Sequence, residues 1–144
     1  MFMIAPLVFL DAHDKYFPSD LTTHIKNTHP EVDFKKVDAG SDPLGLENLD
    51  SLNKLGGSKV YLTSNEDVTK LPKYLHGTRP NSKTLKTTDT KSCAVILIDK
   101  GAGITDAFYM YFYTFNQGPT FSGYELGDHL GDWYVASCLC RVLC

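Results

Sequence analysis

The chain has no apolar run long enough to cross a bilayer, and its 144 residues show neither an internal repeat nor a heptad pattern. A membrane-spanning helix needs about 20 consecutive apolar residues, so no such helix is expected. The apolar beginning of the sequence is short, contains Pro6 and has no basic residue before it, and so does not read as a secretory signal. The residues themselves leave the compartment open.

Positive charge and cysteine are also scarce. The formal net charge is −3, which gives no electrostatic support for a nucleic-acid partner. The composition, with 42% hydrophobic and 22% charged residues, is average for a soluble globular protein, and the length suits one domain. Of the four cysteines, Cys93 lies in an apolar run and is expected to be a buried free thiol. The other three crowd the last seven residues in a weak metal pattern that lacks a fourth ligand.

Two apolar runs in the second half of the sequence predict the centre of the fold. Residues 93–98 form a short run rich in β-branched side chains, which favours a buried strand. Residues 107–115 hold six aromatic side chains and are apolar on both alternating faces, so both faces need cover, as inside a sandwich. Gly101 and Gly103 suit the turn between the two runs. We expect a hairpin over residues 93–116 in a mainly β, antiparallel sandwich-like domain, with core packing favoured over sugar stacking for the tyrosines.

A few short helices are expected in the N-terminal half. Ser19 is a plausible N-cap for a helix over residues 20–27, which Pro30 would end. A second helix is expected over residues 47–57 and a helical turn near residue 70, with strands over 5–10 and 60–63. Residues 31–46, 78–92 and 120–126 are expected to be loops. The histidines at 13, 24 and 29 are expected at the surface or as caps.

The G-D-H-L-G-D-W motif of residues 127–133 is the candidate site. Asp128, His129 and Asp132 place two carboxylates and an imidazole within five residues, a donor set that suits Mg²⁺, Mn²⁺ or Ca²⁺. The same groups could form an acid–base pair. A third interpretation is a turn in which the two aspartates accept backbone N–H bonds and Gly131 takes a positive φ. Spacing alone favours this last interpretation.

Eight segments, taken together, resemble the N-terminal part of the fungal vacuolar protein sorting-associated protein 62 family. They are A-P-L-V-F from residue 5, Y-F-P-S-D-L from 16, L-E-N-L-D-S-L-N from 46, V-Y-L-T-S-N from 60, C-A-V-I-L from 93, D-A-F-Y-M-Y-F-Y from 106, F-N-Q-G-P from 115 and the motif from 127. They follow in order over about residues 4–133. The resemblance implies a β-rich, non-enzymatic domain of a family named for delivering proteins to the vacuole. It also implies trafficking proteins or vacuolar cargo as partners, a place in the vacuole or secretory pathway, and no catalytic residues.

The motif by itself also resembles the G-H-R-H-D-W-E signature of secreted necrosis- and ethylene-inducing toxins. In these β-sandwich proteins the first histidine, the aspartate and the glutamate help to hold a divalent cation used at the membrane surface. By position the resemblance implies His129 and Asp132 as ligands, with Trp133 as their neighbour. Both families continue with glutamate after the tryptophan, whereas this chain has Tyr134. Because an expected ligand is missing, we expect weak or no metal binding here, and Ca²⁺ or Mg²⁺ only in a full-length form.

Residues 134–144 do not follow the family pattern, and the family normally continues with further strands. We expect a partial domain over residues 4–133 and a tail over 134–144 that comes from a retained intron or a gene-model error. Trp-Tyr-Val can be encoded with a splice-donor sequence, and sequencing the processed transcript tests this hypothesis. Missing strands would expose apolar faces and strand edges, which predicts aggregation.

Three functions follow from these interpretations. The favoured one is the non-enzymatic role in sorting to the vacuole. The alternative is a divalent-metal-dependent module that binds membrane surfaces as the toxins do. A hydrolase that uses His129 with Asp128 or Asp132 is least favoured, because no nucleophile elbow, phosphate loop or zinc-ligand set accompanies these residues.

Overall fold

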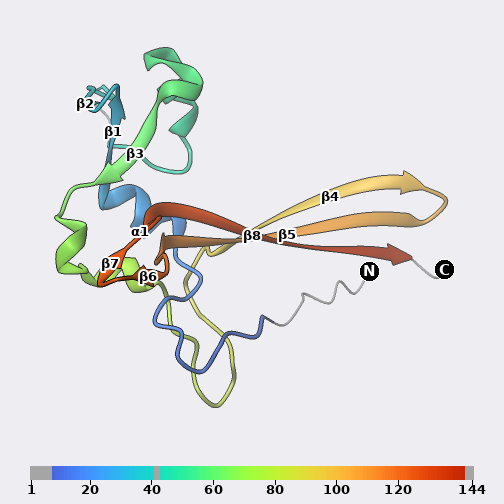
Figure 1. Cartoon of the computed structure of the whole chain (residues 1–144). Coiled ribbons are helices and arrows are strands. Elements are labelled where there is room, and N and C mark those ends of the chain that lie inside the picture. The colour runs from blue at the N-terminus through green and yellow to red at the C-terminus, as the bar shows by residue number, and fades with distance from the viewer. Residues whose placement is uncertain (1–7, 41–42, 142–144) are drawn as a thin grey trace.

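The computed structural model describes residues 8–40 and 43–141, with side chains up to residue 137 in the last strand. A long three-stranded ribbon projects from a region of short helices and strands (Figure 1). The elements in chain order are α1 (Leu21–Lys26), β1 (Thr28–Val32), β2 (Lys35–Lys36), η1 (Leu49–Leu55), η2 (Gly57–Lys59), β3 (Tyr61–Ser64), η3 (Val68–Lys70), η4 (Lys73–His76), β4 (Cys93–Gly101), β5 (Ile104–Asn116), β6 (Thr120–Phe121), β7 (Tyr124–Glu125) and β8 (His129–Arg141), where η marks a 3₁₀ helix. All strand pairs are antiparallel, which confirms the expected mainly β class with a few short helices. In the described part of the chain, no helix is long and apolar enough to span a membrane.

The predicted hairpin over residues 93–116 is confirmed as β4 and β5. The order of the sheet is β4-β5-β8, so β5 has a neighbour along both of its edges. The register runs from Cys93 opposite Tyr111 to Gly101 opposite Ile104. On the other edge, β8 pairs with β5 from Asn116 opposite His129 to Ile104 opposite Arg141. Residues 134–141, expected to be a tail outside the family pattern, therefore form most of β8.

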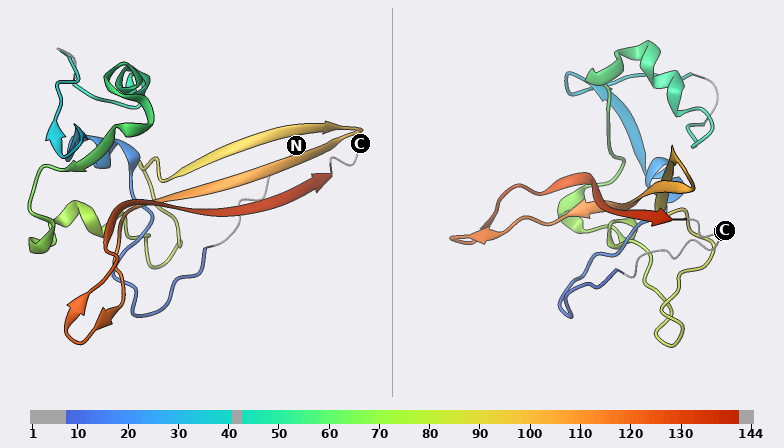
Figure 2. Two further views of the ribbon diagram at one scale, coloured as in Figure 1. Left: turned by 45° about the horizontal axis from the view of Figure 1, so that its top comes forward. Right: turned by 90° about the vertical axis from the view of Figure 1, so that its right-hand side faces the viewer.

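Among the described residues, the sheet is covered on both faces only at the end near the motif. Side chains alternate between faces along a strand, so Phe112 and Phe115 point to opposite sides of β5. On one side, the ring of His24 from α1 meets Phe112 edge-on, with centroids 4.8 Å apart. On the other side, Phe115 packs with Tyr16 and the fully buried Leu75 of η4. This end of the sheet, seen from two further sides in Figure 2, contains the core.

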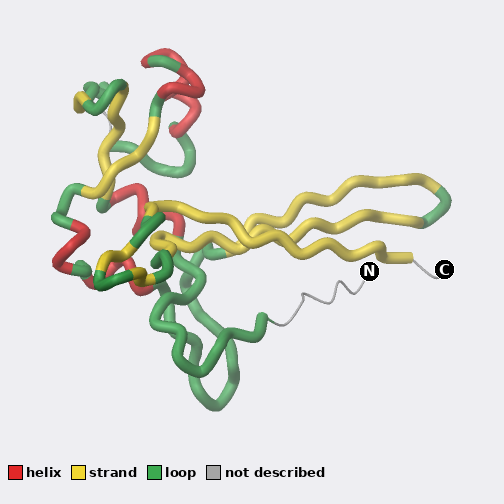
Figure 3. Tube along the Cα trace, in the orientation of Figure 1, coloured by secondary structure: helices red, strands yellow, loops and turns green. Residues whose placement is uncertain are grey.

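The far end of the sheet leaves apolar side chains open to solvent. Four consecutive residues of β4, from Val95 to Ile98, are 45–50% exposed, and Val135 of β8 is 58% exposed. Figure 3 shows these strands extending beyond the helices and loops. Since side chains alternate, both faces carry exposed apolar groups here, as expected for a ribbon that lacks covering layers. The expected aggregation stays a prediction.

The prediction of a loop over residues 31–46 was wrong at its beginning, because β1 and β2 form a hairpin there. β1 lies between β2 and β3, with Pro30 opposite Leu62. Asp33 and Phe34 both have positive φ, 49° and 59°, as a two-residue hairpin turn requires. The N–H of Phe34 donates to the Tyr61 hydroxyl at 2.8 Å, which helps to hold this unusual turn residue. Proline was interpreted only as a stop for the helix, and the strand that contains it was therefore missed.

The helix before β1 begins one residue later than predicted, and its cap is different. Asp20, and not Ser19, is the N-cap, with its Oδ1 accepting from the N–H of Thr23 at 2.7 Å. Ser19 is buried, and its Oγ accepts from the N–H of Thr114 in β5 at 3.0 Å. The serine thus connects the segment before α1 to the central strand, a long-range role that capping rules cannot indicate.

The remaining predictions have mixed outcomes. The helix expected over 47–57 is the 3₁₀ helix η1, the strand expected over 60–63 is β3, and residues 78–92 form an irregular loop, as predicted. Residues 120–126 were predicted to be a loop but include the small hairpin of β6 and β7. Of the strand expected over 5–10, residues 5–7 lie outside the described residues, and residues 8–10 are irregular. The surface position predicted for His24 was wrong, since only 6% of it is exposed.

Candidate functional site

The two aspartates of the motif accept hydrogen bonds from the chain itself. Asp128 Oδ1 accepts from the backbone N–H of Gly118 at 2.7 Å. Asp132 Oδ1 accepts from the N–H of Trp133 at 2.8 Å, and its Oδ2 accepts from the side-chain amide of Asn116 at 3.0 Å. Gly131 has a φ of +74°. These bonds and the positive φ of Gly131 match the interpretation in which the two aspartates accept backbone N–H bonds. Asp132, however, lies within β8 and not in a turn.

The imidazole of the motif lies beside only one of the two carboxylates. His129 Nε2 is 3.6 Å from Asp132 Oδ2, and His129 Nδ1 is 3.0 Å from the carbonyl of Gly127. Because a carbonyl can only accept, this contact places the proton of neutral His129 on Nδ1 and leaves the lone pair on Nε2 beside Asp132. Asp128 is occupied with Gly118. Among the described residues, no group of three or more histidine, cysteine or acidic side chains is arranged to hold a metal ion.

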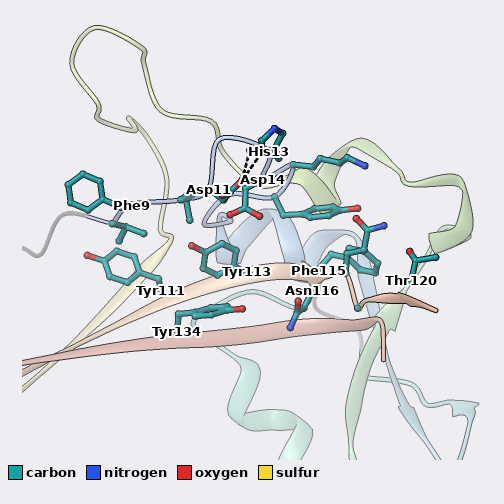
Figure 4. Close-up of a pocket in the computed structure, with 16 residues that line it drawn as sticks. Phe9, Asp11, His13, Asp14, Tyr111, Tyr113, Phe115, Asn116, Thr120 and Tyr134 are labelled. Carbon is teal, nitrogen blue, oxygen red and sulfur yellow. Dashed lines mark hydrogen bonds and ion pairs between the residues drawn. The ribbon is translucent and has the colours of Figure 1, made fainter. Parts of the chain in front are cut away.

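Next to the motif, the structure contains a cavity of about 650 Å³ (Figure 4). It lies between residues 8–16 and the core ends of β5 and β8, and the loop after β5 closes one side. The lining residues are Val8, Phe9, Leu10, Asp11, His13, Asp14, Lys15, Tyr16, Tyr111, Tyr113, Phe115, Asn116, Gln117, Gly118, Thr120 and Tyr134. The two aspartates of the motif hold Asn116 and Gly118, so the motif positions one wall of this cavity.

The sheet side of the cavity is aromatic. The rings of Tyr113 and Tyr134 pack edge to face, with centroids 4.9 Å apart and planes at 66°. Tyr113 is almost buried, whereas Tyr134 is 55% exposed. Burial, followed by the nearby Tyr134, Asp14 and Tyr111, raises the pKa of Tyr113 to about 12. The Tyr113 hydroxyl therefore stays neutral at physiological pH and can donate a hydrogen bond.

The opposite side of the cavity is acidic. Figure 4 shows Asp11, His13 and Asp14 across the cavity from the tyrosines. Asp11 Oδ1 forms hydrogen bonds with the backbone N–H of His13 at 2.8 Å and with the Nδ1 atom of its ring at 3.0 Å. Both bonds lower the pKa of Asp11, and the bond from the backbone has the larger effect. Asp11 therefore stays ionised. Burial raises the pKa of Tyr16, and the carboxylates of Glu125 and Asp128 add to this rise, so acidic groups also approach the cavity from the motif side.

Two curated proteins of Saccharomyces cerevisiae match nearly the whole chain. "Putative vacuolar protein sorting-associated protein TDA6" is 34% identical over 142 aligned residues, which cover 89% of this chain and 30% of the relative. Vacuolar protein sorting-associated protein 62 is 32% identical over 149 aligned residues, which cover 90% of this chain and 30% of the relative. The chain is related to the vacuolar protein sorting-associated protein 62 family. This relationship confirms the resemblance on which the sequence analysis depended. The chain spans about 30% of the length of these two relatives. No family model and no solved structure matches it.

For this relative of the vacuolar protein sorting-associated protein 62 family, sequence reasoning found the motif but missed the cavity. The tyrosines of β5 were assigned to the core, and no role was predicted for residues 11–15 beyond a surface or capping position for His13. Tyr134 was noted because it stands where the family has glutamate, and it proves to line the cavity. The one usable signal was the row of aromatic residues at 111, 113 and 115 on a single face. Nothing in the sequence indicates which distant segment faces that row.

Titration with Ca²⁺ or Mg²⁺ should give no saturable binding in the micromolar range for this chain. In the described part of the motif only His129 Nε2 and Asp132 Oδ2 lie together, and two side-chain ligands hold a hard cation poorly. Isothermal titration calorimetry of chelator-treated protein measures this directly. Saturable binding that disappears in His129→Ala but persists in the exposed control His13→Ala would contradict the prediction and support the metal-dependent membrane alternative.

Proposed function

We propose that this chain is a non-enzymatic binding domain that acts in the sorting of proteins to the vacuole. The observation that carries the proposal is the identity of 34% and 32% to two relatives named for vacuolar protein sorting, across 89% and 90% of the chain. Its partners would be trafficking proteins or vacuolar cargo. The proposal assigns the role given in the relatives' names to a chain that spans about 30% of their length.

The geometry of the motif supports binding over catalysis. Asp128 accepts from a backbone N–H, and both oxygens of Asp132 accept from groups of the chain. Carboxylates used in this way stabilise the loop after β5 and the beginning of β8. They are therefore less available to act as a base or as a metal ligand. The adjacent cavity has the neutral hydroxyl of Tyr113 and the ionised carboxylate of Asp11, which suit noncovalent recognition of a ligand.

Deleting the gene in the organism that encodes it, together with any other family copies, should increase the secretion of a soluble vacuolar hydrolase. A sorting factor is needed to divert such hydrolases from the secretory route, so its loss sends them to the medium. Immunoblots of medium and cell extract measure the secreted fraction, and reintroducing the wild-type gene is the control. An unchanged secreted fraction in the strain without any family copy would contradict the proposal.

A further inference from the structure

We propose that the cavity between residues 8–16 and the sheet binds the cationic side chain of an arginine or lysine presented by a partner peptide. This rests on the proposed binding role of the domain and names the chemistry of its ligand. The volume of about 650 Å³ accommodates a long side chain together with some flanking backbone.

The aromatic side offers ring faces to a cation. Tyr134 is 55% exposed and Phe9 is 85% exposed, and both line the cavity. The edge-to-face contact with Tyr113 supports the Tyr134 ring. Cations lying over the face of an aromatic ring are attracted by its quadrupole, and arginine does this most often in proteins. Rings alone would accept any flat or apolar ligand, so the charge of the cavity decides between ligand classes.

The acidic side gives the cavity a negative balance. Asp11 and Asp14 line it, against the single ammonium of Lys15. The carboxylate of Asp14 is close enough to Tyr113 to contribute to the raised pKa of that hydroxyl, and Glu125 and Asp128 act in the same way on Tyr16. Three carboxylates, those of Asp14, Glu125 and Asp128, therefore act on the aromatic rings of this site, and Asp11 also lines it. An anion would be repelled, and a neutral sugar would gain nothing from the charge.

The same carboxylates favour a cation that carries N–H donors. Asp11 uses only Oδ1 for its bonds to His13, and the Asp14 carboxylate has no hydrogen bond or ion pair to another described residue. Figure 4 shows Asp14 pointing toward Tyr113 across the cavity. An ammonium or guanidinium group can donate hydrogen bonds to these oxygens while it lies against the rings. A quaternary ammonium such as choline has no N–H to donate, so the geometry favours a basic side chain.

The test compares a blocked Gly-Arg-Gly tripeptide with the same peptide containing citrulline, a neutral isostere of arginine, by calorimetric titration into the full chain. We expect saturable binding of the arginine peptide that weakens between about 50 and 300 mM salt, because exposed charges are screened over this range. The citrulline peptide should bind roughly tenfold more weakly or not at all, since it keeps the shape and loses the charge. A lysine peptide should bind in the same salt-dependent way.

Two variants and two controls locate the site. Asp14→Asn and Tyr134→Ala should each weaken binding of the arginine peptide by roughly tenfold, through the lost charge and the lost ring. Asp50→Asn and Tyr124→Ala remove an exposed acid and an exposed ring outside the cavity and should leave binding unchanged. All four positions are exposed, so circular dichroism should confirm an intact fold in each variant.

Three results would overturn the inference: no saturable binding of either basic peptide, equal binding of the citrulline peptide, or a response to mannose or choline at concentrations where the basic peptides give none. Each would leave the sorting proposal standing, because the secreted hydrolase fraction does not depend on which ligand enters the cavity. Conversely, normal sorting in the deletion strain would not remove a measured, salt-dependent affinity for the arginine peptide.

Discussion

Gly77→Ala should destabilise the protein by at least about 3 kcal/mol, as measured by urea unfolding. Gly77 follows η4 with φ +71° and ψ −164°, a region of backbone conformation that is essentially restricted to glycine. A Cβ added there would lie 1.9 Å from the carbonyl oxygen of Phe17 and 2.9 Å from Ser19 Oγ. The oxygen cannot move freely, because hydrogen bonds from Phe17 to His76 and from Thr78 to Pro18 join the two segments on either side. Strain and steric clash therefore add together.

A matched control separates these two contributions. Gly57 also has a positive φ, +57°, but an added Cβ there would meet nothing within 4 Å. Gly57→Ala should therefore cost only the backbone strain, about 1 kcal/mol. Equal losses for the two variants would show that the close approach of residues 17 and 77 is not part of the folded state. That result would also question the core around Leu75, because η4 could then not be held against β5.

Lowering the pH from 6.5 to 4 should cost the folded protein about 3 kcal/mol through His24 alone. Burial lowers the pKa of this histidine to about 4, since its ring packs against Phe112. Its Nδ1 has no hydrogen-bond partner among the described residues. The unfolded chain therefore binds a proton in this range that the folded chain does not. The stability contribution of neutral His24 is fully present above pH 6.5 and is lost as the pH falls toward 4.

Urea unfolding at pH 7 and at pH 4.5 tests the prediction with few interfering groups. Burial alone would raise the pKa of Asp20, but hydrogen bonds from Lys91 and Thr23 lower it below its ordinary value of 3.8. Its stabilisation is therefore lost only as the pH falls below that value. The variant His24→Gln should lose most of the pH dependence, whereas His13→Gln at an exposed position should keep it. If wild type and His24→Gln showed the same slope, the histidine would not be buried as the structure has it.

The parts of the fold that were predicted correctly depend on local patterns. The β-branched run at 93–98 and the aromatic run at 107–115 define β4 and β5, since their side chains fit a pleated sheet and little else. The glycines between them allow the turn that joins the strands. By contrast, β1 contains Pro30 and only five residues, and it exists because β3 pairs along it. No periodicity within such a short segment could have distinguished it from a loop.

In the candidate site, too, the features that depend on local patterns were predicted, and those that depend on distant contacts were not. The hydrogen bonds of Asp128 and Asp132 to backbone groups were among the interpretations drawn from the motif, because short polar side chains next to glycine commonly cap the backbone. The partners themselves were not predictable, since Gly118 and Asn116 belong to another element. His24 shows the limit most clearly. It was predicted to lie at the surface or to act as a cap, yet it is buried, because α1 lies across the face of β5 that carries Phe112.

By itself, the sequence determined the β-rich class, the central hairpin and the family relationship. These follow from the preferences of neighbouring residues and from residue identity. Only the tertiary structure decided that Ser19 contacts β5, that His24 is buried, and that an acidic turn near the N-terminus faces tyrosines about 100 positions later. The physical reason is that packing joins segments across long loops, and the energy that selects one such arrangement belongs to the whole core and not to any one stretch of the chain.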